Sequence, residues 1–100
     1  MELELKKERF YGLIDGTKVS TSRLGHRSAV IGEELVIKMT ENPKISYTGR
    51  IVDVQYCTFS ELTEEEAIAE GYGSLSELRE NLVTLYNPQP DDEFTLIRFS

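Results

Sequence analysis

The feature that most constrains the fold is a pair of strand-like segments in the middle of the chain. In the segment 34–39 every second residue is large and apolar, which is typical of a strand with one buried face. The segment 47–57 continues this alternation, and a turn-forming sequence at 41–43 separates the two. We therefore expect an antiparallel pair in a curved sheet, with Gly49 marking a bulge or bend. The two faces expected for the longer strand are Val52, Val54 and Tyr56 against Ile51, Asp53 and Gln55.

A strand, a helix and a second strand are expected before this pair. Leu3 and Leu5 alternate with charged residues, as in a short strand. Apolar residues within 10–14 recur at helical spacing, and the helix should stop at Gly16. The segment 19–23 is rich in β-branched and hydroxyl residues and predicts a short strand.

Two helices and a final strand are expected after the pair. Capping-box patterns at 63–66 and 74–77 each predict the start of a helix. The apolar stripe expected on the second helix is Leu75, Leu78, Leu82 and Leu85. A strand at 94–99 closes the chain. Because the elements follow no regular βαβ rhythm, we expect an α+β domain spanning 1–100, whose mixed sheet curls into a small barrel with two or three flanking helices.

Composition narrows the class of protein further. The chain has 100 residues, of which 39% are hydrophobic, and this suits one domain with one core. No apolar run approaches the roughly 20 residues of a membrane span, and the first ten residues are charged where a signal peptide needs an apolar segment. With a single cysteine, Cys57, and a single histidine, His26, neither a disulfide nor a Cys/His zinc site can form. We expect a soluble, cytoplasmic protein without a metal, a cofactor or a membrane partner.

Charge is unevenly distributed along the chain. The net charge of -7 argues against a protein that grips long nucleic acid by its phosphates. Lys18, Arg23, His26 and Arg27 nevertheless lie within ten residues of one another. A local basic patch that contacts a small or short anionic ligand is therefore still open.

The basic segment contains DGTKVSTSR, residues 15–23, which has too many hydrogen-bonding side chains for a core strand. Lys18 is a candidate general base if burial and Arg23 lower its pKa, and is otherwise a solvated turn lysine. Thr21 is a candidate nucleophile or an ordinary strand threonine. In a regular strand Thr21 would face away from Lys18, so the pair requires either that Lys18 lies at the turn or that its long side chain bends round. Arg23 either clamps a phosphate or carbonyl, or pairs with an acidic side chain.

Two candidates lie later in the chain. Glu70 falls in the last turn of a helix, where the helix dipole opposes its charge, so it is either functional or one of many surface glutamates. Tyr72 either stacks on a base or packs against Leu75. We interpret His26 as a loop residue and not as a base.

Several of these segments, in order along the chain, resemble the ASCH domain family, which is related to the PUA domains. The most specific is the G-x-K-x-x-T-x-R element from Gly16 to Arg23. The other matching segments are Ile14-Asp15-Gly16, Gly32-Glu33, Phe59-Ser60-Glu61-Leu62-Thr63, Ala69-Glu70-Gly71-Tyr72 and Leu75-Ser76-Glu77-Leu78. The sequence departs from the family pattern at Glu33, where aspartate is more usual, and in a loop-like insertion at 24–27.

The resemblance implies a PUA-like β-barrel with a cleft at its mouth, in a family proposed to bind RNA and nucleotide-like ligands. Small bacterial members of about this length hydrolyse the amide of N4-acetylcytidine with a lysine, a threonine and a glutamate. By position in the motif, these would be Lys18, Thr21 and Glu70. The ligand contacts we expect around them are Gly16, Ser20, Arg23 and Tyr72.

Two functions of different classes are therefore open. The first is a module that binds a nucleoside, a nucleotide or a short RNA element. The second is an amidohydrolase that acts on N4-acetylcytidine or a related N-acyl nucleoside. A plain interaction domain would suit the acidic composition but would leave residues 15–23 unexplained.

Overall fold

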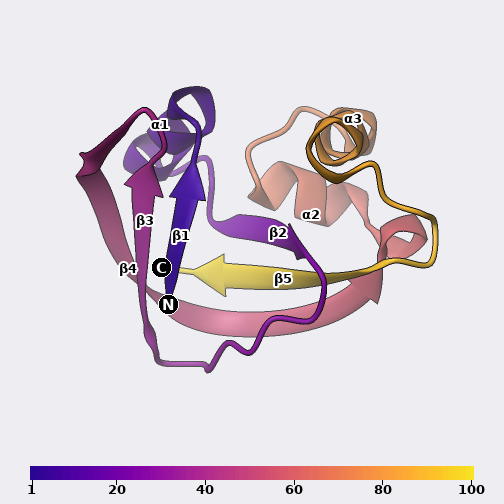
Figure 1. The fold of residues 1–100 in the computed structure, drawn as a ribbon, viewed down its shortest axis with the longest axis horizontal. Coiled ribbons are helices and arrows are strands. Elements are labelled where there is room, and N and C mark those ends of the chain that lie inside the picture. Colours follow the sequence, from indigo (N-terminus) through magenta and orange to yellow (C-terminus); the bar gives the residue numbers. More distant parts are fainter.

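A computed structural model describes residues 1–100 and shows a mixed five-stranded sheet curled into a half-barrel with short helices beside it (Figure 1). The α+β class and the barrel-like sheet expected from the sequence are confirmed. The order of strands across the sheet is β1-β3-β4-β5-β2. The elements are β1 Glu2–Leu5, α1 Lys7–Asp15, β2 Ser20–Leu24, β3 Glu34–Met39, β4 Asn42–Thr58, the short 3-10 turn η1 Phe59–Glu61, α2 Glu64–Ala69, α3 Leu75–Tyr86 and β5 Glu93–Phe99.

Strand β4 is 17 residues long and connects the two halves of the sheet. Its first half pairs antiparallel with β3, and its second half pairs antiparallel with β5. In Figure 1 this strand sweeps along one side of the molecule, with α1 near one end and α2 and α3 near the other. The turn expected at 41–43 is shorter than predicted, because β4 already begins at Asn42.

A β-bulge in β4 lies between Ile51 and Asp53, two residues beyond Gly49. The predicted faces of this strand are therefore wrong at Ile51 and Val52, since the extra residue of a bulge interrupts the alternation of side chains. Beyond the bulge, the predicted groupings of Val54 with Tyr56 and of Asp53 with Gln55 hold. Ile51 is buried, whereas Val52 is 45% exposed. Gly49 has a different role: a Cβ atom at this position would lie 2.6 Å from the carbonyl oxygen of Ser100, so only glycine lets the C-terminus pass this closely.

Apolar side chains gather in two places. A cluster of nine buried residues joins α1 to β1, β3, β4 and β5, with Phe10, Leu35 and Ile37 among its most buried members. A smaller cluster of five joins α2 and α3 to β5. Of the stripe expected on α3, Leu78 and Leu82 are buried in this second cluster, but Leu85 is 49% exposed.

The two edges of the sheet lie near each other without pairing. β1 pairs only with β3, in parallel, and β2 pairs only with β5. The guanidinium of Arg23 on β2 spans the opening and donates to the carbonyl oxygen of Glu4 on β1, at 3.1 Å. The half-barrel therefore has an opening between β1 and β2. None of the helices combines the length and apolar composition that a membrane span requires.

Helix α2 covers the free edge of β2. The backbone N–H of Val19, just before β2, donates to the carbonyl oxygen of Ala69 at 2.7 Å. Further along, the backbone N–H of Ser22 donates to a carboxylate oxygen of Glu70 at 3.2 Å. The end of α2 thus supplies acceptors that a neighbouring strand would otherwise provide.

Candidate functional site

A cleft of about 330 Å³ lies at the opening between β1 and β2, bordered by α1 and α3. Lys18, Thr21, Arg23, Glu70 and Tyr72 all line it. These residues come from the turn before β2, from β2 itself and from the end of α2. The structure therefore brings together the three residues expected to be catalytic and two of the four expected to contact a ligand.

The two other expected ligand contacts lie outside the lining of the cleft. Gly16 ends α1 in the left-handed conformation, with φ of 82°, and its role is to turn the chain toward β2. Ser20 is 1% exposed and donates its hydroxyl to Glu66 at 2.7 Å, behind the cleft wall. His26 is also outside, exposed on the loop after β2, where it stacks on Tyr56.

Lys18 is the most unusual residue of the site, because its side chain is buried and its only carboxylate partner, Glu70, is at the long end of ion-pair distance. It precedes β2 at the turn, which is the position that pairing with Thr21 requires. Its Nζ donates to the carbonyl oxygen of Ser20 at 2.8 Å and lies 3.8 Å from Oε1 of Glu70. Gly12 of α1 makes room for its stem, since a Cβ there would lie 3.1 Å from the Cβ of Lys18.

Burial dominates the electrostatics of Lys18. Loss of water lowers its pKa from 10.5 to about 8, against the opposing charge of Glu70 and with a further lowering by Arg9 and Arg23. A lysine with this pKa releases a proton near neutral pH far more readily than a solvated lysine. Lys18 therefore meets the electrostatic requirement for a general base.

Glu70 is held by donors from three parts of the chain. Ser22 donates its hydroxyl to one carboxylate oxygen and its backbone N–H to the other. Arg9 of α1 donates to the carbonyl oxygen of Glu70 at 2.9 Å. These donors, together with the nearby Lys18, offset the unfavourable position of an acid at the end of a helix.

Glu66 was not predicted as a site residue, and its sequence position indicated only a capping residue of α2. Glu66 is 6% exposed and accepts from Ser20, while Arg98 lies 3.8 Å away. Burial, with the hydrogen bond and charge of Glu70, raises the pKa of Glu66 from 4.5 to about 8, although Ser20 and Arg98 oppose the shift. The pair formed by Glu66 and Glu70 therefore retains a proton more readily than two solvated carboxyl groups do.

A spacing pattern in the sequence was available to find Glu66. Glu66 and Glu70 are four residues apart and so share one face of α2. Ser20 and Ser22 are two residues apart and so share one face of β2. Each serine hydroxyl binds one of the two carboxyl groups. Two acids four residues apart on a helix can therefore each meet one of two alternating hydroxyls on a strand. This spacing predicts the pairs Ser20–Glu66 and Ser22–Glu70.

Arg9 was also missed, because it lies in a helix far from the motif. Its guanidinium stacks over the ring of Tyr72, 3.8 Å from the ring centroid, and both side chains line the cleft. The Nε atoms of Arg9 and Arg23 are buried and have no hydrogen-bond partner. The cleft is therefore lined by a stacked planar pair, while the two Nε–H groups are buried beneath its surface without a protein partner.

Thr21 shares the cleft with Lys18 but does not touch it through a hydrogen bond. Thr21 is 2% exposed and lies opposite Ile97 in the sheet. The Nζ donor of Lys18 is directed to Ser20 and Glu70. Catalytic hydrogen bonds are often long before a substrate is bound, so this arrangement is compatible with a lysine and threonine pair that forms around a substrate. The structure contains no group of three or more His, Cys, Asp or Glu side chains placed to hold a metal.

Comparisons with known proteins identify the fold. No family model matches the sequence, and no curated protein matches it significantly. The structure superposes on the ASCH domain from Lactobacillus crispatus JV V101 with a TM-score of 0.83 and 17% identity, over 99% of this chain and 78% of that one. A protein from Enterococcus faecalis V583 gives a TM-score of 0.74 and 18% identity over 100% and 75% of the two chains.

A third structure, ASCH from Zymomonas mobilis, gives a TM-score of 0.72 and 13% identity, over 99% of this chain and 65% of that one. These neighbours agree with the arrangement of five strands and three short α-helices found here. The protein therefore has the ASCH-domain fold, as the motifs in its sequence suggested.

Proposed function

We propose that the protein binds a nucleoside, a nucleotide or a short RNA element in the cleft between β1 and β2. The observation that carries this proposal is that Lys18, Thr21, Arg23, Glu70 and Tyr72 line one cleft. Its volume of about 330 Å³ falls within the usual range of small-molecule sites. A domain that needed these polar residues only for folding would have no reason to gather them around a hollow.

The chemistry of the lining suits a flat, polar ligand. Arg9, stacked on Tyr72, offers a planar surface on which a base can stack. Lys18, Arg23 and the carboxyl of Glu70 offer donors and an acceptor for the edges of a base or for a sugar hydroxyl. With a net charge of -7, the protein can neutralise few phosphates, so any RNA contact is short and its salt dependence shallow.

Calorimetric titration with cytidine, N4-acetylcytidine and the other common nucleosides tests this proposal. Replacing Arg23 by glutamine or Lys18 by methionine should leave the protein folded and weaken binding at least about tenfold, since each removes a charged hydrogen-bond donor from the cleft. Arg50→Gln is the matched control, because Arg50 is exposed and lies outside the cleft. Absence of binding to every nucleoside, or equal weakening by the control, would contradict the proposal.

Hydrolysis of an N-acyl nucleoside is a second candidate, favoured by the buried Lys18 with a pKa near 8 in the same cleft as Thr21. Neutral Lys18 would take the proton of the Thr21 hydroxyl, whose oxygen attacks the acyl carbon. The amine would leave with a proton from the carboxyl pair of Glu66 and Glu70. Water would then hydrolyse the acyl ester and free Thr21.

Release of acetate and cytidine from N4-acetylcytidine tests this second function. Lys18→Ala, Thr21→Ala and Glu70→Ala should each remove most of the turnover, and a double variant should lose little more, because the residues act as one unit. Thr48→Ala, an exposed position on β4, is the matched control for the threonine. Turnover that survives both Lys18→Ala and Thr21→Ala would exclude this mechanism and leave the binding function in place.

A further inference from the structure

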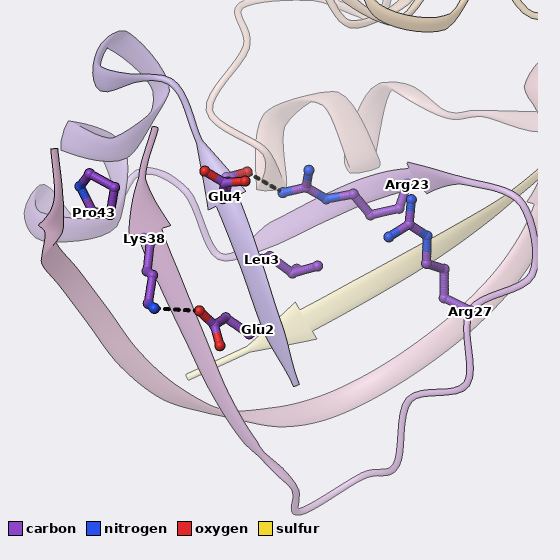
Figure 2. A pocket seen from close by; sticks show the side chains of 7 residues that line it. All are labelled: Glu2, Leu3, Glu4, Arg23, Arg27, Lys38 and Pro43. Atoms are coloured by element: carbon purple, nitrogen blue, oxygen red, sulfur yellow. Dashed lines mark hydrogen bonds and ion pairs between the residues drawn. The ribbon is translucent and has the colours of Figure 1, made fainter. Parts of the chain in front are cut away.

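A second hollow lies beside the cleft, on the other side of Arg23 and Glu4, which line both (Figure 2). It has a volume of about 590 Å³ and is more open to solvent than the cleft. Three basic side chains line it, Arg23, Arg27 and Lys38, against two acidic ones, Glu2 and Glu4. In a protein with a net charge of -7, this is a local excess of positive charge.

The two arginines of this hollow lack acidic partners. Lys38 is neutralised by Glu2, whose carboxylate lies 2.6 Å from its Nζ. Arg23 donates only to a backbone carbonyl across the opening, and Arg27 makes one long contact of 3.5 Å to the carbonyl oxygen of Leu24. Neither arginine is within ion-pair distance of a carboxylate. Most of their N–H donors are therefore available to a ligand.

We propose that Arg23 and Arg27 bind a phosphate group of a nucleotide whose nucleoside part occupies the cleft. This proposal rests on the function proposed above and specifies the ligand further. Both side chains line the same hollow. In Figure 2 the side chain of Arg23, from β2, extends toward Glu4, and that of Arg27, from the loop that follows, extends toward β2. Two planar forks can each give paired N–H donors to phosphate oxygens, which is the geometry that arginine offers and lysine does not.

The arrangement favours one phosphate attached to the nucleoside over a long polyanion. The cleft and the hollow share Arg23, so a phosphate one or two bonds from the ribose can reach its guanidinium while the base remains in the cleft. Only two cations are without a carboxylate partner in the hollow, and Glu2 and Glu4 border it. Each additional phosphate would approach these acids and gain no further partner.

Calorimetric titration with cytidine, cytidine 5′-monophosphate and cytidine 3′-monophosphate tests the proposal, with the ratio of nucleotide to nucleoside affinity as the readout. At low salt, one of the two monophosphates should bind about tenfold more tightly than cytidine, since a phosphate gains charge-assisted hydrogen bonds. Arg27→Gln should bring this ratio close to one, and Arg27→Glu should bring it below one. The side chain of Arg27 is exposed and lies in the loop after β2, so we expect its substitution to leave the sheet intact.

Lys44→Gln is the control, because Lys44 is exposed and lies outside both hollows but carries the same charge. This variant should keep the full affinity ratio. If cytidine binds and neither monophosphate binds more tightly, or if Arg27→Gln leaves the ratio unchanged, the phosphate site is overturned and the cleft remains. If neither the nucleoside nor the nucleotides bind, the proposed function and the phosphate site both fail.

Discussion

Two regions of this molecule are equally buried and chemically opposite. One is the apolar cluster that joins α1 to the sheet, in which no member is more than 7% exposed. The other is the contact between β2 and α2, formed by Lys18, Ser20, Ser22, Glu66 and Glu70, in which no member is more than 6% exposed. We call this second region the polar seam. Burial alone therefore does not separate a region that holds the fold together from one that serves a site.

The two regions differ in what burial does to their free energy. Burial of an apolar side chain stabilises the fold in proportion to the apolar area removed from water. This effect is not directional, so any apolar neighbour of suitable shape can provide it. A buried carboxyl or ammonium group loses its hydration free energy. Only correctly placed hydrogen-bond or ion-pair partners offset this loss. In the seam, each serine binds one carboxyl group, but the ion pair of Lys18 with Glu70 is long, at 3.8 Å. The polar seam therefore contains titratable groups whose pKa values are shifted toward neutral pH. The apolar cluster contains no titratable group.

The largest expected effect is the loss of a core side chain. Ile37→Ala should lower the free energy of unfolding by roughly 2 to 5 kcal/mol, because it leaves a cavity around a side chain that is 0% exposed. Ile37→Val, which removes a single methylene, should cost only about 0.5 to 1.5 kcal/mol. Urea unfolding measures both, and the loss should be the same at pH 6 and pH 8. A loss of stability that changed with pH would contradict the expected difference between the apolar cluster and the polar seam.

A pH dependence of stability is expected from the seam. Folding raises the pKa of Glu66 from 4.5 to about 8, so between these values the folded protein holds a proton that the unfolded chain has released. The free energy of unfolding should therefore fall as pH rises from 5 to 8, by up to roughly 1.4 kcal/mol per pH unit. Lys18 acts in the opposite direction above pH 8, because its pKa is lowered on folding.

The variant Glu66→Gln isolates this effect, since an amide can still accept a hydrogen bond from Ser20 but does not titrate. Its free energy of unfolding should change little between pH 5 and pH 8. Glu65→Gln is the matched control, because Glu65 is an exposed neighbour in the same helix turn. If the wild type and Glu66→Gln had the same pH profile, Glu66 would titrate as an ordinary surface acid.

The smallest expected effect comes from a single hydroxyl of the seam. Ser22→Ala removes one donor from the buried carboxylate of Glu70 and should cost about 1 to 3 kcal/mol, far more than the size of the group suggests. Ser76→Ala, at an exposed position of α3, should change stability by no more than about 0.5 kcal/mol. Thermal unfolding of the two variants makes the comparison. Equal losses of stability in the two variants would show that the Ser22 hydroxyl contributes no more to the fold than an exposed hydroxyl does.

Much of the fold could be predicted because its signals are local. The alternation at 34–39 gave β3, and the capping residues Thr63 and Ser74 each bind the backbone three residues on, at the starts of α2 and α3. Gly49 predicted a bulge or bend in β4, but the bulge lies two residues further on, where the strand changes partner from β3 to β5. The predicted faces of β4 were wrong at Ile51 and Val52 for the same reason.

For the candidate site, the sequence by itself determined which residue types are present and that the helix ends at Gly16, since these are local features. The structure decided that Lys18 lies at the turn before β2. Only the tertiary structure decided that Lys18 is buried, that Glu66 faces Ser20, and that Arg9 stacks on Tyr72. The hydrogen bond between Ser20 and Glu66 spans 46 residues, and that between Arg9 and Glu70 spans 61. Such distant groups acquire a common low-dielectric environment, and with it their shifted pKa values, only when α2 packs against β2.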